Sequence, residues 1–189
     1  MDKKDYIETQ APLLELTDLT GTPIPLAALW QKQPLLIFFL RHFGCALCRS
    51  HLRLLNDAYP RLSAQGASVV AITFSDAVSA AYLQYTQRVS FPLLLDSTRR
   101  AYRAFGMTDG SLRDALGPRI LVQQLRQIPN GQLPYIPPGA NLTQLVGSVI
   151  VDTAGMIRFH HLALPIDHYP TVEQYLAVLG QLSSSSLES

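Results

Sequence analysis

The sequence predicts an α/β fold in which buried parallel strands alternate with helices, followed by a β-hairpin and a last helix. The continuous apolar run at 35–40 and the mostly apolar segment at 67–73 have the length and composition of strands that are buried on both faces. Each run is followed by a segment with apolar residues at helical spacing, which is typical of parallel strands joined by helical crossovers. Further along, the segments at 145–151 and 156–161 flank the turn sequence DTAG, which predicts a hairpin.

The first part of the chain is expected to form a hairpin, a buried strand and a helix. Short strands at 13–16 and 22–26 flank the turn sequence DLTGT, and two prolines in the second strand suit the edge of a sheet. The buried strand at 35–40 leads into a helix that begins at Ala46. Pro60 is expected to kink or end that helix because proline lacks the N–H of the helical hydrogen bond.

The middle of the chain is expected to hold two more strands, each followed by a helix. Asp76 suits the N-cap of the first helix because its carboxylate can accept hydrogen bonds from the free N–H groups there, and Asp96 opens the second helix. In order, we predict a strand at 67–73, a helix through 88, a strand at 91–95, a helix ending near 106 and, after the hairpin, a helix at 171–182.

Residues 107–144 interrupt the alternation. The segment 111–131 has apolar residues at helical spacing, and the sequence LPYIPPGAN that follows holds three prolines in nine residues. We interpret this stretch as an insertion that consists of one helix and an ordered proline-rich loop. Insertions of this length often act as lids or partner surfaces, although packing against the flank of the domain is the more common role.

Composition restricts the class of protein. The chain of 189 residues with 48% hydrophobic content suits one domain, expected at 11–182, between a tail at 1–10 and a disordered Ser-rich tail at 183–189. The net charge of +1 and the absence of a basic stripe argue against a nucleic-acid partner. The longest strictly apolar run, 35–40, is too short to span a bilayer, so no membrane role is expected. The polar N-terminus does not have the pattern of a secretory signal, so we expect a cytoplasmic location.

The two cysteines of the chain are Cys45 and Cys48, in the stretch LRHFGCALCR. They fall in the first turn of the helix after a buried strand, at the carboxyl edge of the sheet, where α/β folds place their chemistry. The free N–H groups of a helix start stabilise a thiolate, and Arg41, His42 and Arg49 add positive charge. The residues therefore predict a reactive thiol pair that can close a disulfide.

Two other roles for the cysteines are open to the sequence. They could be small apolar core residues. The pattern His42-x-x-Cys45-x-x-Cys48-x-x-His51 also holds four residue types that bind zinc. One continuous helix cannot easily turn four such ligands onto one tetrahedral ion, however, so we expect neither a metal nor another cofactor.

Five segments carry a resemblance to a known family: APLLELTDLTGTPIPLAAL, FFLRHFGCALCR, AYRAFGM, QLVGSVIVDTAGMIRFHH and IDHYP. The chain resembles the peroxiredoxin-like branch of the alkyl hydroperoxide reductase/thiol-specific antioxidant (AhpC/TSA) family, in the thioredoxin-like superfamily. The resemblance covers about residues 10 to 180. It implies a thioredoxin-like fold, with a central mixed sheet flanked by helices, an N-terminal β-hairpin and an insertion near 107–144.

The resemblance also implies an activity, a thiol-dependent antioxidant oxidoreductase that reduces peroxides while Cys45 and Cys48 cycle between dithiol and disulfide. The implied electron donor is of the thioredoxin or glutathione type, and a homodimer is possible. Matching the segments puts Cys48 at the peroxidatic position of the family, with Cys45 in place of its Thr or Ser. In thioredoxins the first cysteine of the motif attacks, which here is Cys45, and helix geometry also favours Cys45.

The chain departs from the family in two places. Arg41-His42-Phe43 stands where peroxiredoxins carry a proline, and Val146 stands where they carry an arginine at the start of a late strand. Arg41, Arg49 or Arg119 is expected to substitute for that arginine. Gly147, next to Val146, is expected to leave space for a substrate beside the thiols.

Two further functions are compatible with the same residues. A thioredoxin-like protein disulfide oxidoreductase would use Cys45 to attack a substrate disulfide and Cys48 to resolve the mixed disulfide. A non-catalytic redox sensor would use the disulfide to change the conformation of the insertion, and a partner would recognise the change.

Overall fold

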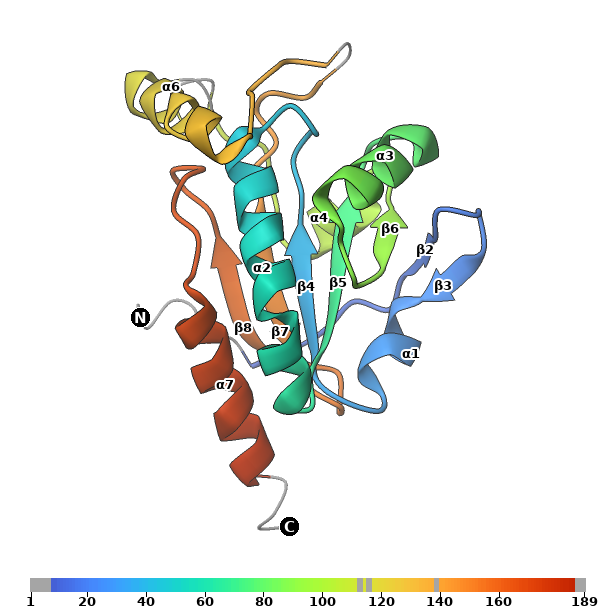
Figure 1. Cartoon of the computed structure of the whole chain (residues 1–189). Coiled ribbons are helices and arrows are strands. Elements are labelled where there is room, and N and C mark those ends of the chain that lie inside the picture. Colours follow the sequence, from blue (N-terminus) through green and yellow to red (C-terminus); the bar gives the residue numbers. More distant parts are fainter. Residues whose placement is uncertain (1–7, 112–113, 115–116, 138–139, 186–189) are drawn as a thin grey trace.

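The computed structural model describes residues 8–111, 114, 117–137 and 140–185. Figure 1 shows a central mixed sheet with helices packed on both of its faces. The strands are β1 (Thr9–Gln10), β2 (Glu15–Thr17), β3 (Pro23–Pro25), β4 (Leu35–Phe39), β5 (Ser68–Thr73), β6 (Leu93–Leu95), β7 (Gly147–Val151) and β8 (Met156–Leu162). The helices are α1 (Leu26–Trp30), α2 (Ala46–Ala64), α3 (Ala77–Gln87), α4 (Arg100–Ala104), α6 (Pro118–Leu125) and α7 (Val172–Ser185), with a 3-10 turn η2 (Ile128–Asn130).

The strand order is β1-β8-β7-β4-β5-β6-β2-β3. Strands β4, β5 and β6 are parallel, as the alternation of strands and helices predicts, and β7 pairs antiparallel with β4. The N-terminal hairpin of β2 and β3 extends the sheet beyond β6. The mixed sheet with flanking helices confirms the thioredoxin-like fold.

The sheet separates two apolar cores. Leu36 and Phe38 of β4 face the core under α2, α3 and α7, whereas Leu35, Ile37 and Phe39 face the core under α1 and α4. All five residues of β4 are buried, which is why the run is continuously apolar. Strand β5, which pairs with β4, is also buried along most of its length.

Helix α2 does not end at Pro60, so of the two expected effects of this proline, a kink or an end, the end is wrong. The helix continues to Ala64 because Leu55, Ala58 and Leu62 stay buried against the sheet on both sides of the proline. Pro60 removes a single N–H from the ladder in the last turns, and the packing of the apolar face outweighs that loss.

The expected limits of the domain also change. Thr9 and Gln10 pair with β8, so strand pairing reaches into the segment expected to be a tail at 1–10. Helix α7 runs to Ser185, inside the segment expected to be disordered at 183–189. Residues 1–7 and 186–189 lie outside the described part of the chain. No helix in the described ranges is long and apolar enough to cross a membrane.

Two helices are shorter than the sequence predicts. Helix α4 begins at Arg100, while Asp96 caps it from the preceding turn by accepting hydrogen bonds from the N–H groups of Arg100 and Ala101. Helix α6 begins at Pro118, where proline suits the first helical position. It ends at Leu125, and Gln127 then donates its N–H to the carbonyl oxygen of Gln124 in a tighter turn that leads to Pro129.

Candidate active site

The thiol pair sits at the carboxyl end of β4, in the middle of the sheet between β5 and β7. Leu40 donates its N–H to the carbonyl oxygen of Ile72 at 2.9 Å, which holds the ends of β4 and β5 together. The hydroxyl of Tyr102 in α4 donates to the carbonyl oxygens of Leu40 and Ile72. These bonds fix the point from which the chain turns into α2.

Cys45 is the N-cap residue of α2, and its sulfur accepts a hydrogen bond from the N–H of Cys48 at 3.3 Å. Both cysteines are free thiols, and their exposed fractions are 0% and 1%. The position is the one predicted from the sequence, where free N–H groups of a helix start point at a sulfur. In this conformation neither sulfur is accessible to a partner in solution.

The two cysteines have opposite acidities. Burial alone would raise the pKa of Cys45, but hydrogen bonds from Cys48 and the positive charges of Arg41 and Arg49 outweigh it and lower the pKa to about 6. Burial raises the pKa of Cys48 well above its usual range, and the neighbouring Cys45 adds to the effect. Cys45 is therefore the thiolate of the pair, and Cys48 is the thiol that donates to it.

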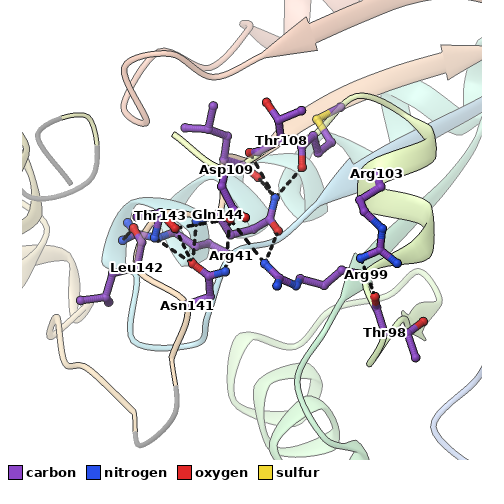
Figure 2. Close-up of polar contacts among 12 residues, drawn as sticks. Arg41, Thr98, Arg99, Arg103, Thr108, Asp109, Asn141, Leu142, Thr143 and Gln144 are labelled. Atoms are coloured by element: carbon purple, nitrogen blue, oxygen red, sulfur yellow. Dashed lines mark hydrogen bonds and ion pairs between the residues drawn. The ribbon is translucent and has the colours of Figure 1, made fainter. Parts of the chain in front are cut away.

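Arg41 lies beside the thiols and is 1% exposed. Its Nη2 donates to the carbonyl oxygen of Leu142 at 2.5 Å, a contact drawn in Figure 2. Its Nε and Nη1 have no hydrogen-bond partner among the described residues. A buried guanidinium with two free N–H donors is unfavourable unless an anion lies nearby. The Cys45 thiolate is such an anion.

Arg49 ties the insertion to the site. Its Nε donates to the side-chain oxygen of Gln132 at 2.8 Å, and its Nη2 donates to the carbonyl oxygen of Leu133 at 2.5 Å. Its Nη1 donates to the carbonyl oxygen of Phe43, in the turn before the cysteines. The guanidinium carbon lies 5.7 Å from the ring centroid of Tyr135, within cation–π range.

His42 does not carry the charge expected from the sequence. Burial, together with the positive charges of Arg41 and Arg49, lowers the pKa of His42 to about 4. The imidazole is therefore neutral at pH 7, and the expectation that it adds positive charge is wrong. Its Nδ1 has no hydrogen-bond partner in the described ranges.

Arg119 is not brought to the thiols. It lies in α6, its side chain is 69% exposed, and its Nε donates to the carboxylate of Asp167 at 3.1 Å. The charges that act on the cysteines are those of Arg41 and Arg49. Of the three arginines expected to replace the family arginine, these two lie at the site.

The space expected beside Gly147 is filled. A Cβ atom at this position would overlap the carbonyl oxygen of His161 in β8 and the sulfur of Met107. Val146, the residue before it, is also fully buried. The missing side chain of Gly147 lets β8 and the start of the insertion pack closely against β7, and it leaves no room for a substrate.

Two residues that contact the sulfurs were not predicted. The side-chain oxygen of Gln124 in α6 accepts the N–H of Ala46 at 2.8 Å, and its amide nitrogen donates to the sulfur of Cys45 at 3.8 Å. The hydroxyl of Tyr169, in the loop before α7, donates to the sulfur of Cys48 at 3.5 Å. The pentapeptide IDHYP holds Tyr169, yet nothing in its spacing points to a cysteine.

The insertion covers the thiols, and Figure 1 shows α6 at the N-terminal end of α2. Tyr135 donates its N–H to the carbonyl oxygen of Gly44 at 3.0 Å. A Cβ atom at Gly44 would overlap the carbonyl oxygen of Tyr135, so only glycine allows the loop to lie this close. The insertion, predicted as a lid or flank, thus forms the outer wall of the site.

The two ends of the insertion are held by Gln144, which is buried. Its amide nitrogen donates to the carbonyl oxygens of Met107 at 2.6 Å and Leu145 at 2.9 Å. Its side-chain oxygen accepts a hydrogen bond from Arg99 at 3.1 Å, and Figure 2 shows the network. The insertion is therefore anchored at its base, independently of its contacts with the thiols.

The site combines an acidic Cys45, a protonated Cys48 and a buried arginine on a thioredoxin-like sheet, which defines a thiol oxidoreductase site. A profile of the AhpC/TSA family matches residues 7–160. The chain belongs to this family, as the resemblance in the sequence predicts.

Curated relatives match the chain over a short segment. A prostamide/prostaglandin F synthase from Salmo salar is 37% identical over 57 residues, which is 30% of this chain and 28% of the relative. The chloroplastic thioredoxin-like protein AAED1 from Arabidopsis thaliana is 36% identical over 59 residues, 31% of this chain and 24% of the relative. The match spans less than a third of the length of either relative.

Solved structures share the fold over nearly the whole chain. Peroxidoxin BcpB from Mycobacterium tuberculosis superposes with a TM-score of 0.66 at 18% identity, covering 94% of this chain and 98% of that one. A yeast mitochondrial 1-Cys peroxiredoxin superposes with a TM-score of 0.68 at 15% identity, covering 96% and 78%. At such identities the similarity establishes the fold.

Proposed function

We propose that this chain is a peroxidase that reduces peroxides through Cys45 and Cys48, which cycle between dithiol and disulfide. The observation that carries the proposal is the acidic Cys45, which accepts hydrogen bonds from Cys48 beside a buried Arg41 with two free donors. Membership of the AhpC/TSA family supports the same chemistry. Cys45 is the nucleophile of this proposal because it is the thiolate, although family matching favours Cys48.

In the first step, the Cys45 thiolate attacks the terminal oxygen of a hydroperoxide. An S–O bond forms, the O–O bond breaks, and the Cys45 sulfur becomes a sulfenic acid. The departing alkoxide takes the proton of the Cys48 thiol and leaves as an alcohol. The free Nε and Nη1 of Arg41 donate hydrogen bonds to the peroxide oxygens, where negative charge develops.

In the second step, the Cys48 thiolate attacks the sulfur of Cys45. An S–S bond forms, the S–O bond breaks, and the departing hydroxide takes a proton from solvent and leaves as water. A dithiol donor of the thioredoxin type, or two molecules of a monothiol donor of the glutathione type, then reduces the disulfide by thiol–disulfide exchange. The donor is oxidised as Cys45 and Cys48 return to thiols.

The insertion has to move before a peroxide can reach Cys45, because both sulfurs are buried. The contacts that must open are those of Gln124 with Ala46 and of Tyr135 with Gly44. The base of the insertion stays held by Gln144.

The proposal is tested by a coupled assay in which a thioredoxin system recycles the protein during hydrogen peroxide reduction. We expect saturable peroxide consumption by the wild-type chain and loss of turnover in Cys45→Ser and Cys48→Ser. A wild-type chain that consumes no more peroxide than Cys45→Ser would refute the proposal.

A protein disulfide oxidoreductase is the second candidate, favoured by the low pKa of Cys45 as the first cysteine of the pair. In that case Cys48→Ser would accumulate a mixed disulfide with a model disulfide substrate. Turnover with the disulfide but not with peroxide would establish this second activity.

A homodimer and a cytoplasmic location stay predictions. Sedimentation velocity of the reduced and oxidised protein tests the first, and fractionation of the source cells tests the second.

A further inference from the structure

Tyr169 is held in one orientation against Cys48. Its ring stacks on His51 of α2, with centroids 4.4 Å apart and planes 15° from parallel. It also meets Phe38 of β4 edge-on, with centroids 6.1 Å apart. These contacts direct the hydroxyl at the Cys48 sulfur, to which it donates a hydrogen bond at 3.5 Å.

The surroundings of Cys48 keep the hydroxyl of Tyr169 protonated, so that it can donate a hydrogen bond. Burial, together with the two cysteines, raises the pKa of Tyr169 well above its usual range, so the hydroxyl keeps its proton. His51, behind the ring, is neutral because burial lowers its pKa to about 3. The other titratable or charged groups that interact with Cys48 are Cys45, Tyr102 and two arginines, Arg41 and Arg49.

We propose that Tyr169 is the residue that enables disulfide closure, because its hydroxyl stabilises the Cys48 thiolate that attacks oxidised Cys45. This inference rests on the proposed function and assigns a role within its second step. There the Cys48 sulfur has lost its proton, forms the S–S bond and displaces hydroxide from the Cys45 sulfenic acid. A hydrogen bond to an anion is stronger than one to a thiol, so Tyr169 acts when Cys48 ionises.

The chain offers a matched control in Tyr175. This residue is fully buried in the same aromatic cluster, and its ring meets His51 at a centroid distance of 6.3 Å. Its hydroxyl donates to the Oγ of Ser148 at 2.8 Å and lies within hydrogen-bond distance of the Nε2 of His51, at 3.3 Å, but it does not contact a sulfur. Tyr175→Phe therefore removes a hydroxyl from the cluster without touching the thiols.

The experiment mixes reduced protein with hydrogen peroxide in a quenched-flow instrument and follows sulfenic acid, disulfide and thiol by mass spectrometry. Tyr169→Phe is expected to form the Cys45 sulfenic acid at the wild-type rate and to close the disulfide about tenfold more slowly. Its closure rate should recover towards the wild-type value as the pH rises, because Cys48 then ionises without help. Tyr175→Phe is expected to close at the wild-type rate.

Closure of Tyr169→Phe at the wild-type rate, or equal slowing in Tyr175→Phe, would overturn the inference. A wild-type chain that forms no sulfenic acid and no disulfide would instead refute the proposed function, and this inference with it. If Tyr169→Phe does not fold by circular dichroism, 3-fluorotyrosine at position 169 replaces it. This stronger donor of similar size should accelerate closure at pH 7, and an unchanged rate would contradict the role of the hydroxyl.

Discussion

At the scale of single residues, the two cysteines differ in acidity and therefore in their roles. Both sulfurs are buried, but Cys45 accepts hydrogen bonds beside positive charge and is the thiolate, whereas Cys48 keeps its proton. The sequence predicted this neighbourhood correctly for Arg41 and Arg49 because both lie within a few residues of the cysteines. It missed Gln124 and Tyr169, which reach the sulfurs from 79 and 121 residues further along the chain. Such contacts depend on tertiary packing and leave no trace in local spacing.

The reactivity of Cys45 should follow its lowered pKa. Because the thiolate is the reactive form, the rate of alkylation by iodoacetamide should rise with pH through about 6 and level off above it. Alkylation of Cys45 is followed by mass spectrometry of the reduced protein between pH 4 and 9. A rate that continues to rise up to about 8.5, the ordinary thiol value, would contradict the lowered pKa.

Arg41→Met should reduce activity more than stability. The change removes the charge that favours the Cys45 thiolate and the donors for the peroxide, so the peroxide rate constant at pH 7 should fall at least about tenfold. The free energy of unfolding should stay within about 1 kcal/mol, because the guanidinium is buried with two unpartnered donors. Arg53→Met, at an exposed arginine of α2, is the control and should change neither quantity.

Whole elements set the access to the site. The order of strands and helices was predictable because apolar runs and helical spacing show burial on one or both faces. The contact of the insertion with Gly44 was not predictable. The sequence does not distinguish a glycine that makes room for a neighbouring carbonyl from a glycine that is required by a turn. The end of α2 was misplaced for a related reason, since packing of Leu62 holds the helix beyond Pro60.

Gly44→Ala should loosen the insertion. The added methyl group overlaps the carbonyl oxygen of Tyr135, so the loop must move away from the thiols. Hydrogen exchange around 132–137 and the rate of thiol alkylation in the native protein should both increase. Gly180→Ala, in α7, is the control, since its Cβ meets only the side chain of Gln65 at 3.8 Å. Unchanged alkylation in Gly44→Ala would show that the insertion does not limit access.

Asp96→Ala should destabilise the chain. The buried carboxylate accepts hydrogen bonds from the N–H groups of Arg100 at 2.9 Å and Ala101 at 2.7 Å, which the alanine leaves unsatisfied. The loss should be about 1–3 kcal/mol in the free energy of unfolding, measured by denaturant titration. Asp57→Ala, at an exposed position of α2, should stay within about 0.5 kcal/mol.

In the whole molecule, a thioredoxin-like sheet holds one thiol pair, and the insertion at 107–144 covers that pair. The fold was predictable from the pattern of apolar segments and from the resemblance to the AhpC/TSA family. The closed cover was not predictable, because the contacts of the insertion with Arg49 and Gly44 arise only when the chain is folded.

The central claim is that Cys45 attacks the peroxide and Cys48 closes the disulfide. Intact-mass spectrometry of the reduced protein, treated with one equivalent of hydrogen peroxide and then alkylated, tests it directly. The account predicts loss of two protons in the wild-type chain and a trapped sulfenic acid in Cys48→Ser but not in Cys45→Ser. A trapped sulfenic acid in Cys45→Ser alone would show that Cys48 attacks, and no oxidation of the wild-type chain would contradict peroxide reduction altogether.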